Sequence, residues 1–307
     1  MSAPSRARTV GSIAEAVGRT PMARLRSVEP EGAEVWAKLE FLNPGGSVKD
    51  RPALNLIQAA EKSGELRPGM SIIDSTSGNT GVALALYGAA RGYEVTLVMP
   101  ENVSSARKSM LSTFGAKIIY SDPMDGSDGA IELVRKIVEE QPGRYFYTNQ
   151  YNNEANWRAH HDGTAEEIIE ALGDRITHFV AGIGTSGTVM GTGRRLRAFR
   201  DDIEVIGVEP DDEFHGLEGL KYIETSIRPG IYDRSVLTRT FFCPTDAGWD
   251  SAEALVRDEG LLVGHSAGAV VHAAKTIAEE ALAAGKKPVV VAVLPDHASR
   301  YVEVRES

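Results

Sequence analysis

The sequence predicts an α/β protein with two open, twisted, mostly parallel sheets flanked by helices. Short runs rich in β-branched residues alternate with amphipathic stretches of about ten to twenty residues, which is typical of parallel strands joined by crossover helices. The chain has 307 residues, enough for about two domains. Hydrophobic residues make up 42% of it and charged residues 25%, so a buried core is expected and disorder is not.

The first half of the chain predicts one compact α/β block. A strand over residues 35–41 is followed by an Asn-Pro-Gly-Gly turn and a helix that ends near Gly64. Ser47 and Asp50 have the spacing of a capping box at the start of this helix. The same alternation predicts strands at 72–74, 95–99, 118–120 and 145–147, one helix that ends near Gly92, and helices that begin near Ser104 and Ser127.

The second half repeats this alternation around one irregular segment. Residues 211–240 lack clear periodicity, and such a length is more typical of a functional excursion than of a simple connection. We expect the two lobes to share an interface, where small-molecule sites usually lie. The predicted elements are helices at 165–172, from the turn after 183 to about 199, at 252–259 and from about 268, and strands at 178–183, 205–208, 261–263 and 289–294.

Charge and composition exclude several classes of partner. The formal net charge of −10 disfavours binding to nucleic acid or to an anionic membrane. No apolar run suits a signal peptide or a membrane span, so we expect a cytoplasmic protein. Cys243 is the single cysteine and follows two phenylalanines, which favours an inert thiol in a buried strand. His160 and His161 would point about 100° apart on a helix, so no metal site is expected.

Four polar or glycine-rich segments each follow a predicted strand and precede a predicted helix. Open α/β sheets bind ligands at the carboxyl ends of their strands, so all four are candidates for a binding site. They are residues 43–51, 76–81, 184–188 and 264–268.

The first two segments predict a reactive amine and a binding site for a carboxylate. Lys49 falls in the first helical turn, where burial and the nearby positive potential would lower its pKa and favour Schiff-base chemistry. A solvated surface lysine is the alternative. The hydroxyls and backbone N–H groups of residues 76–81 suit an uncharged grip on a carboxylate, although Ser77 or Asn79 could also simply cap the helix.

The last two segments leave the cofactor open. Residues 182–187 match the dinucleotide fingerprint G-x-G-x-x-G, and Glu209 ends the next strand where a ribose-binding acid would lie. The hydroxyls of this turn also suit a terminal phosphate dianion, so phosphate binding is the prediction that both interpretations share. Taken alone, Ser266 is predicted to be a helix N-cap rather than a cofactor ligand.

In this order the four segments closely resemble the cysteine synthase and cystathionine β-synthase family, the fold type II pyridoxal-phosphate enzymes with a tryptophan synthase β-like fold. Further matches lie at residues 18–21, 98–102 and 294–296, and at Gln150 with Asn156, so the resemblance covers nearly the whole chain. It implies a smaller mobile domain, residues 45–150, which carries the carboxylate loop. A larger domain, residues 1–44 and 151–307, would anchor the cofactor phosphate.

The resemblance also implies roles for individual residues. Lys49 would form the imine with pyridoxal phosphate, Asn79 would bond to the phenolic oxygen of the ring, and Ser266 would meet the pyridine nitrogen. In the substrate loop it places Gly219 and Lys221, and we hypothesise that Lys221 contacts an anionic leaving group; an exposed loop lysine is equally consistent. The phosphate would be held by Gly184, Thr185, Ser186, Gly187 and Thr188, and the substrate carboxylate by Thr76, Ser77, Asn79, Thr80 and Gln150.

The activity implied by the resemblance is that of a cysteine synthase. A sulfur nucleophile would replace the acetyl or phosphate group of O-acetylserine or O-phosphoserine through an α-aminoacrylate, with Lys49 as general base, to give L-cysteine. The resemblance suggests a homodimer, and a serine acetyltransferase or a sulfur-carrier protein as partners. Three alternatives stay open: a cystathionine β-synthase, an NAD-dependent oxidoreductase, and a non-catalytic ligand sensor.

Overall fold

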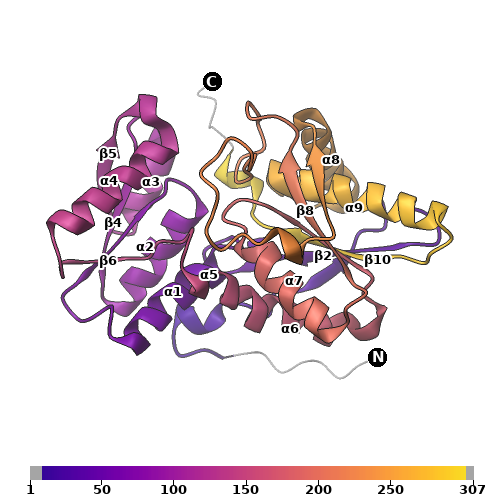
Figure 1. Ribbon diagram of the computed structural model, residues 1–307, viewed down its shortest axis with the longest axis horizontal. Helices are drawn as coiled ribbons and strands as arrows, with labels where there is room; N and C mark the ends of the chain where they lie inside the picture. The colour runs from indigo at the N-terminus through magenta and orange to yellow at the C-terminus, as the bar shows by residue number, and fades with distance from the viewer. Residues whose placement is uncertain (1–8, 302–307) are drawn as a thin grey trace.

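Two twisted sheets, each covered by helices on both faces, organise the protein (Figure 1). The structure, a computed structural model, describes residues 9–301. The predicted fold class is confirmed: all strand pairs of both sheets are parallel except the pair formed by β1 and β2.

The four-stranded sheet has the order β5-β4-β3-β6. Helices α1 and α2 pack on one face of it and α4 covers the other, because each helix turns an apolar stripe toward the sheet. We call this unit the small lobe. Its strands are β3 (Ser71–Ser75), β4 (Glu94–Pro100), β5 (Lys117–Ser121) and β6 (Tyr145–Tyr147), and its helices are α1 (Asp50–Ser63), α2 (Asn79–Arg91), α3 (Ser105–Thr113) and α4 (Gly126–Glu140).

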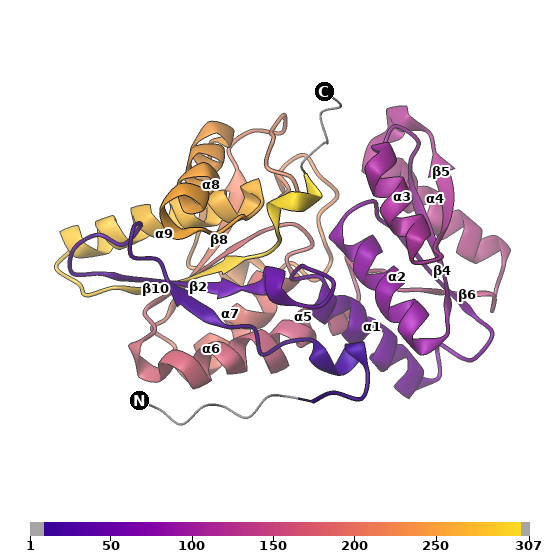
Figure 2. The ribbon, with the colours of Figure 1, turned by 180° about the vertical axis from the view of Figure 1, so that it is seen from behind.

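The six-stranded sheet has the order β1-β2-β10-β7-β8-β9, and we call its unit the large lobe. Figure 2 shows β10, the last strand of the chain, beside β2, one of the first. Helices α8 and α9 cover one face and α6 and α7 the other. The strands are β1 (Met22–Arg24), β2 (Glu34–Leu39), β7 (His178–Gly182), β8 (Glu204–Pro210), β9 (Arg239–Cys243) and β10 (Val289–Leu294), and the helices are α5 (Glu154–Ala159), α6 (Ala165–Leu172), α7 (Gly187–Phe199), α8 (Thr245–Glu259) and α9 (His265–Ala283).

Most predicted elements are confirmed to within a few residues. Helices α1 and α2 end where Gly64 and Gly92 take the left-handed conformation, with φ of +80° and +79°, as the sequence indicates. Cys243 is fully buried in β9. None of the helices within residues 9–301 combines the length and the apolar character needed to cross a membrane.

The strand predicted at residues 261–263 is wrong. Val263 makes an isolated bridge with His297, and α9 begins at His265 rather than near residue 268. The segment is short because it leads directly from α8 into α9, which leaves no length for a ladder. The consequence is a close pairing of the start of α9 with the chain that leaves β10, and this pairing shapes one wall of the site described next.

Candidate active site

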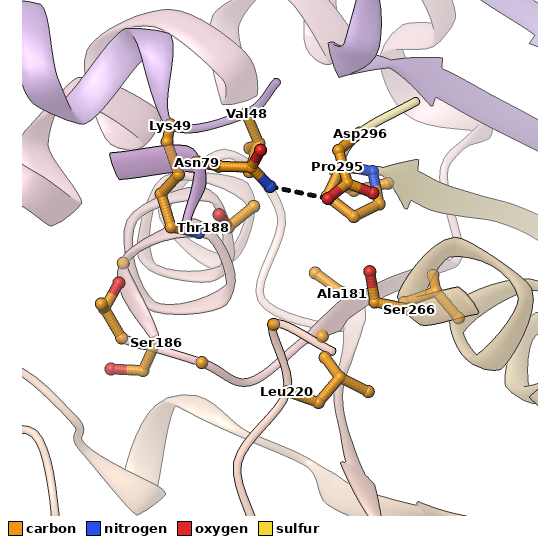
Figure 3. A pocket seen from close by; sticks show the side chains of 17 residues that line it. Val48, Lys49, Asn79, Ala181, Ser186, Thr188, Leu220, Ser266, Pro295 and Asp296 are labelled. Carbon is orange, nitrogen blue, oxygen red and sulfur yellow. Dashed lines mark hydrogen bonds between the residues drawn. The ribbon is translucent and has the colours of Figure 1, made fainter. Parts of the chain in front are cut away.

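A cavity at the junction of the two lobes collects the predicted cofactor residues (Figure 3). The start of α1 and the start of α2 reach it from one side, and the turn before α7, the start of α9 and the chain after β10 reach it from the other. The starts of α2 and α7 and the chain after β10 lie at carboxyl ends of parallel strands, where open α/β sheets bind ligands, and the start of α9 is held beside them by the bridge from Val263 to His297. The predicted residues that line the cavity are Lys49, Asn79, Gly184, Thr185, Ser186, Gly187, Thr188, Gly219 and Ser266.

Lys49 stands at the N-cap of α1, held by the residues on either side of it. The carboxylate of Asp50 accepts a hydrogen bond from the Ser47 backbone N–H at 3.1 Å, and the Ser47 hydroxyl accepts one from the Lys49 backbone N–H at 3.2 Å. The Lys49 amine itself has no hydrogen-bond partner among the described residues. Burial lowers the pKa of this amine, and the negative charge of Asp296 opposes that effect. The direction agrees with the expectation for Lys49, with burial rather than a nearby positive charge as its cause.

A buried ion network fixes the chain just beyond Lys49. The Arg51 guanidinium donates to both carboxylate oxygens of Glu40, at 2.7 and 2.8 Å, and to both of Glu167, at 2.7 Å each. The Lys38 amine lies 2.6 Å from the same Glu167 carboxylate. This bidentate geometry sets the start of α1 rigidly against the large lobe, so the position of Lys49 is determined from behind.

The turn before α7 has the geometry of an anion site. Ser186, at the N-cap of α7, takes a φ of +68°, which a non-glycine residue adopts only when its surroundings require it. Its buried hydroxyl has no hydrogen-bond partner among the described residues. A Cβ on Gly184 would lie 2.4 Å from the Gly219 carbonyl oxygen, and one on Gly187 would lie 2.0 Å from Asn156 Oδ1. Both glycines are therefore required by close packing next to a helix N-terminus.

A chain of hydrogen bonds joins the carboxylate segment to this turn. The Thr80 hydroxyl donates to Gln150 Oε1 at 2.8 Å, and the Asn156 amide donates to the Gln150 carbonyl at 2.6 Å. The same amide nitrogen lies 3.2 Å from the Thr185 hydroxyl. Thr80 and Gln150 are buried and do not line the cavity, so they support its wall from behind.

Three of the other predicted substrate residues lie near the cavity but not in its lining. Ser77 lines a neighbouring cleft between α2, α3 and residues 215–220. The Thr76 hydroxyl accepts a hydrogen bond from the Gly78 backbone N–H at 3.3 Å. The Lys221 amine stands over the Tyr151 ring, 5.2 Å from its centroid, and its backbone N–H donates to Ile183.

Sequence reasoning assigned no role to Asp296 and Tyr301. Asp296 lines the cavity, is 2% exposed, and accepts hydrogen bonds from the Asn79 amide at 2.6 Å and from the Tyr301 hydroxyl. His265 stacks between Trp249 and Tyr301, with ring centroids 4.6 and 6.3 Å away, and therefore packs rather than acting as a base in the cavity. The signals for Asp296 were its place just after the last strand and its membership of the matching segment 294–296.

Known proteins of one family match this chain over nearly its whole length. A family model described as pyridoxal-phosphate dependent enzyme matches residues 13–296. The chain belongs to that family. The cysteine synthase of Aquifex aeolicus is 50% identical over 95% of this chain and 90% of its own length, and cysteine synthase B of Escherichia coli is 36% identical over 95% of both.

Solved structures extend the similarity from sequence to fold. The crystal structure of a cysteine synthase from Entamoeba histolytica superimposes with a TM-score of 0.92 at 36% identity, over 99% of this chain and 92% of that one. An O-ureido-L-serine synthase superimposes with a TM-score of 0.91 at 37% identity, over 97% and 95% of the two chains. The predicted enzyme class and cofactor, a pyridoxal-phosphate-dependent enzyme, are thereby confirmed.

The residues of the cavity fit this cofactor. The Lys49 amine, which has no hydrogen-bond partner among the described residues, suits its aldehyde, and the turn with the open Ser186 hydroxyl suits its phosphate. Ser266, 3% exposed, adds a hydroxyl to the cavity lining. The alternative interpretation, a dinucleotide site, requires an acidic residue at the ribose, and the structure does not place Glu209 there. The carboxylate of Glu209 accepts a hydrogen bond from the Ile223 backbone N–H at 3.0 Å, and Glu209 does not line the cavity.

Proposed function

We propose that this chain is a cysteine synthase that replaces the activated hydroxyl of an O-substituted L-serine with a sulfur nucleophile. The observation that carries the proposal is the Lys49 amine, which has no partner within residues 9–301 and shares one cavity with the start of α7, whose turn suits an anion. The 50% identity to the Aquifex aeolicus cysteine synthase supports this choice within the family.

The cavity divides the binding of pyridoxal phosphate among four segments. Lys49 would hold the aldehyde carbon, and Asn79 would donate to the phenolic oxygen. The Ser266 hydroxyl would meet the ring nitrogen; unlike a carboxylate, it does not force a proton onto that nitrogen. The phosphate would be held by Gly184, Thr185, Ser186, Gly187 and Thr188, where the start of α7 favours negative charge.

The chemistry needs a base at the substrate α-carbon. When bound, pyridoxal phosphate supplies an electron sink that acidifies the Cα–H bond and lets the substituent on Cβ depart. The Lys49 amine, freed when the substrate amine takes its place, stands where it can accept the Cα proton on Nζ and later return it. Its lowered pKa provides the neutral amine that this step requires. Two half-reactions with one nucleophile each imply ping-pong kinetics.

The substrate carboxylate would bind at the start of α2. Thr76, Ser77, Asn79 and Thr80 surround the N-terminal turn of that helix, and Gln150 supports it through Thr80. Such an uncharged site leaves the amine as the cation of the cavity. We propose that residues 45–150 close over the carboxylate by turning about the anchored start of α1, which excludes water during the reaction.

Lys221 is proposed to select the leaving group. Burial lowers the pKa of its amine, which lies over the ring of Tyr151, and its neighbours Gly219 and Leu220 line the cavity. A charge-assisted hydrogen bond of roughly 1.5–3 kcal/mol to a phosphate would favour O-phosphoserine over O-acetylserine about ten- to a hundredfold. The ratio of kcat/KM for the two substrates in wild type and Lys221→Ala tests this. An unchanged ratio would show that Lys221 does not contact the leaving group.

The proposed activity is tested with the purified holoenzyme, an activated serine and sulfide. L-cysteine, detected by mass spectrometry, should form in proportion to enzyme, and Lys49→Ala should form none while retaining its fold. A wild-type protein that binds the cofactor but releases no cysteine from any combination of O-acetylserine or O-phosphoserine with sulfide or thiosulfate would refute the proposal. Formation of cystathionine with homocysteine instead would favour cystathionine β-synthase.

We further propose that the chain works in the cytoplasm as a homodimer. The small-molecule substrates enter between the lobes, and a serine acetyltransferase or a sulfur-carrier protein are the proposed protein partners. Light scattering on the eluted holoenzyme checks the assembly: a mass near 66 kDa, twice the 33.0 kDa of one chain, supports the dimer, and a mass near 33 kDa contradicts it.

A further inference from the structure

Asp296 is a buried carboxylate in the cavity wall that the proposed function leaves without a task. It follows β10 directly and is 2% exposed. Its Oδ2 accepts hydrogen bonds from Asn79, in the small lobe, at 2.6 Å and from the Tyr301 hydroxyl. Its Oδ1 is buried and accepts no hydrogen bond from the described residues. Because buried carboxylate oxygens are normally satisfied, an open one in a cavity wall points to a task there.

The group best placed to use this charge is Lys49. Figure 3 shows Asp296 beside Asn79, with Lys49 on the other side of that amide. Lys49 and Asp296 are the charged side chains among the described residues that line the cavity. Burial raises the pKa of Asp296, and the Lys49 amine opposes that effect as Asp296 opposes the effect of burial on Lys49, but the two groups form no ion pair within 4.0 Å. The carboxylate therefore stabilises the charged form of the amine, and the nitrogen atom still remains free to react.

We propose that Asp296 is a positioning residue that supplies the negative charge against which the Lys49 amine holds a proton during the reaction. The inference rests on the proposed function, in which Lys49 alternates between a neutral amine and an ammonium. Burial alone favours the neutral amine. A carboxylate across the cavity makes the charged form accessible without blocking the nitrogen by a direct contact.

The other charges nearby do not replace Asp296. His160 lies behind Lys49, 1% exposed, and burial lowers its pKa to about 3, so it is neutral at ordinary pH. Arg300 faces Asp296 from the segment after β10, and its guanidinium donates to the Gly45 carbonyl. Tyr301 faces Asp296 as an uncharged donor, since burial and Asp296 both raise the pKa of its hydroxyl. From α2 and α9 come the neutral side chains of Asn79 and Ser266.

The test is the pH at which the apoenzyme captures pyridoxal phosphate on Lys49. Asp296→Asn keeps the size of the side chain and an acceptor for Asn79 but removes the charge. Loss of a facing negative charge lowers the pKa of the Lys49 amine, so more of it is neutral at a given pH. We expect the midpoint of capture, followed by visible absorbance and by mass spectrometry of the borohydride-reduced adduct, to fall by about one to two pH units.

Tyr301→Phe is the matched control, because it removes one hydrogen bond to Asp296 and keeps the charge. We expect its midpoint to stay within about 0.3 units of wild type, since a shift of one unit corresponds to the larger charge effect. In turnover, Asp296→Asn should lower kcat for β-replacement about tenfold or more and change KM by less than about threefold, as a base weakened by one pKa unit or more requires.

A folded Asp296→Asn protein with the wild-type midpoint would overturn the proposal. If that variant does not fold, Asp296→Ser decides: it also removes the charge, so the midpoint must fall, and an unmoved midpoint overturns the proposal equally. The proposed function fails separately. A wild-type protein that captures the cofactor on Lys49 but makes no cysteine refutes the activity and leaves the titration of Lys49 as a valid test of Asp296. Capture on a different lysine refutes both.

Discussion

Removing the Arg51 guanidinium should cost more stability than any other single change in the buried network behind Lys49. Arg51 is 5% exposed and Glu40 fully buried, and two hydrogen bonds join them. In Arg51→Met, Glu40 keeps hydrogen bonds from the Thr20 hydroxyl at 2.7 Å and the Asn43 amide at 2.9 Å, and of the cations it keeps the more distant Lys38. A buried charge that loses its partner destabilises a protein by about 3–5 kcal/mol, so we expect a loss of that size.

The reasoning predicts a characteristic result for the double variant. Glu40→Gln combined with Arg51→Met removes both charges, and replacing a whole buried pair is often close to neutral, so the double variant should be more stable than Arg51→Met alone. Glu167 retains Lys38 at 2.6 Å in either case. The free energy of unfolding of wild type, Glu40→Gln, Arg51→Met and the double variant is measured by urea unfolding, followed by circular dichroism and by tryptophan fluorescence. The values are compared only if the two signals give coincident transitions.

Two outcomes would refute this account of the network. One is an Arg51→Met protein destabilised by less than about 1 kcal/mol, which would mean that water replaces the guanidinium at Glu40. The other is a double variant whose loss equals the sum of the two single losses, which would show that the two side chains do not interact energetically.

Three further predictions concern the phosphate turn, acid stability and the thiol. Gly187→Ala should weaken binding of pyridoxal phosphate at least tenfold, measured by fluorescence titration, because its Cβ would lie 2.0 Å from Asn156 Oδ1. Burial would raise the pKa of Glu167, but Arg51 and Lys38 lower it to about 2, so its stabilisation is present above the unfolded pKa of about 4.3 and is lost as the pH falls from there toward 2. Glu167→Gln should therefore lose less thermal stability than wild type between about pH 5 and pH 3. Burial raises the pKa of Cys243 to about 12, so an aromatic disulfide reagent should label it only after denaturation, and rapid labelling of the native protein would contradict its placement in the core.

Local patterns predicted the fold because most of its elements have local causes. Helices α1 and α2 end at left-handed glycines that the sequence displays, and the central strands β3 and β4 are buried runs between such signals. The failure at residues 261–263 has the opposite cause. Whether Val263 continues a ladder depends on its partner His297, which lies far along the chain and offers one bridge. Strand β1 and helix α5 are too short for periodicity to detect.

The sequence likewise predicted some parts of the candidate site and missed others. Lys49, Asn79 and the turn 184–188 stand directly after strands, so the topology alone brings them to one edge, and the structure places them in one cavity. The hydrogen bond from Asn79 to Asp296 joins residues 217 positions apart, and the chain from Thr80 to Thr185 passes through Asn156. Such contacts depend on how two lobes meet, and a pattern within one segment carries no information about that.

The strength of the contacts on each side of the cavity suggests how the enzyme can open without losing its cofactor. The phosphate turn, Ser266 and Asp296 all belong to the large lobe, and their supports there are buried. On the outer side of the cleft, the lobes meet through the Arg107–Glu218 ion pair, whose side chains are 30% and 51% exposed and which therefore contributes about 1 kcal/mol or less. Moving the carboxylate segment away from the large lobe breaks that pair, the bond from Asn79 to Asp296, and the bond from the Asn156 amide to the Gln150 carbonyl. The turn 184–188, which would bind the phosphate, is not involved in that movement. Substrate exchange and cofactor retention can therefore be controlled by different contacts.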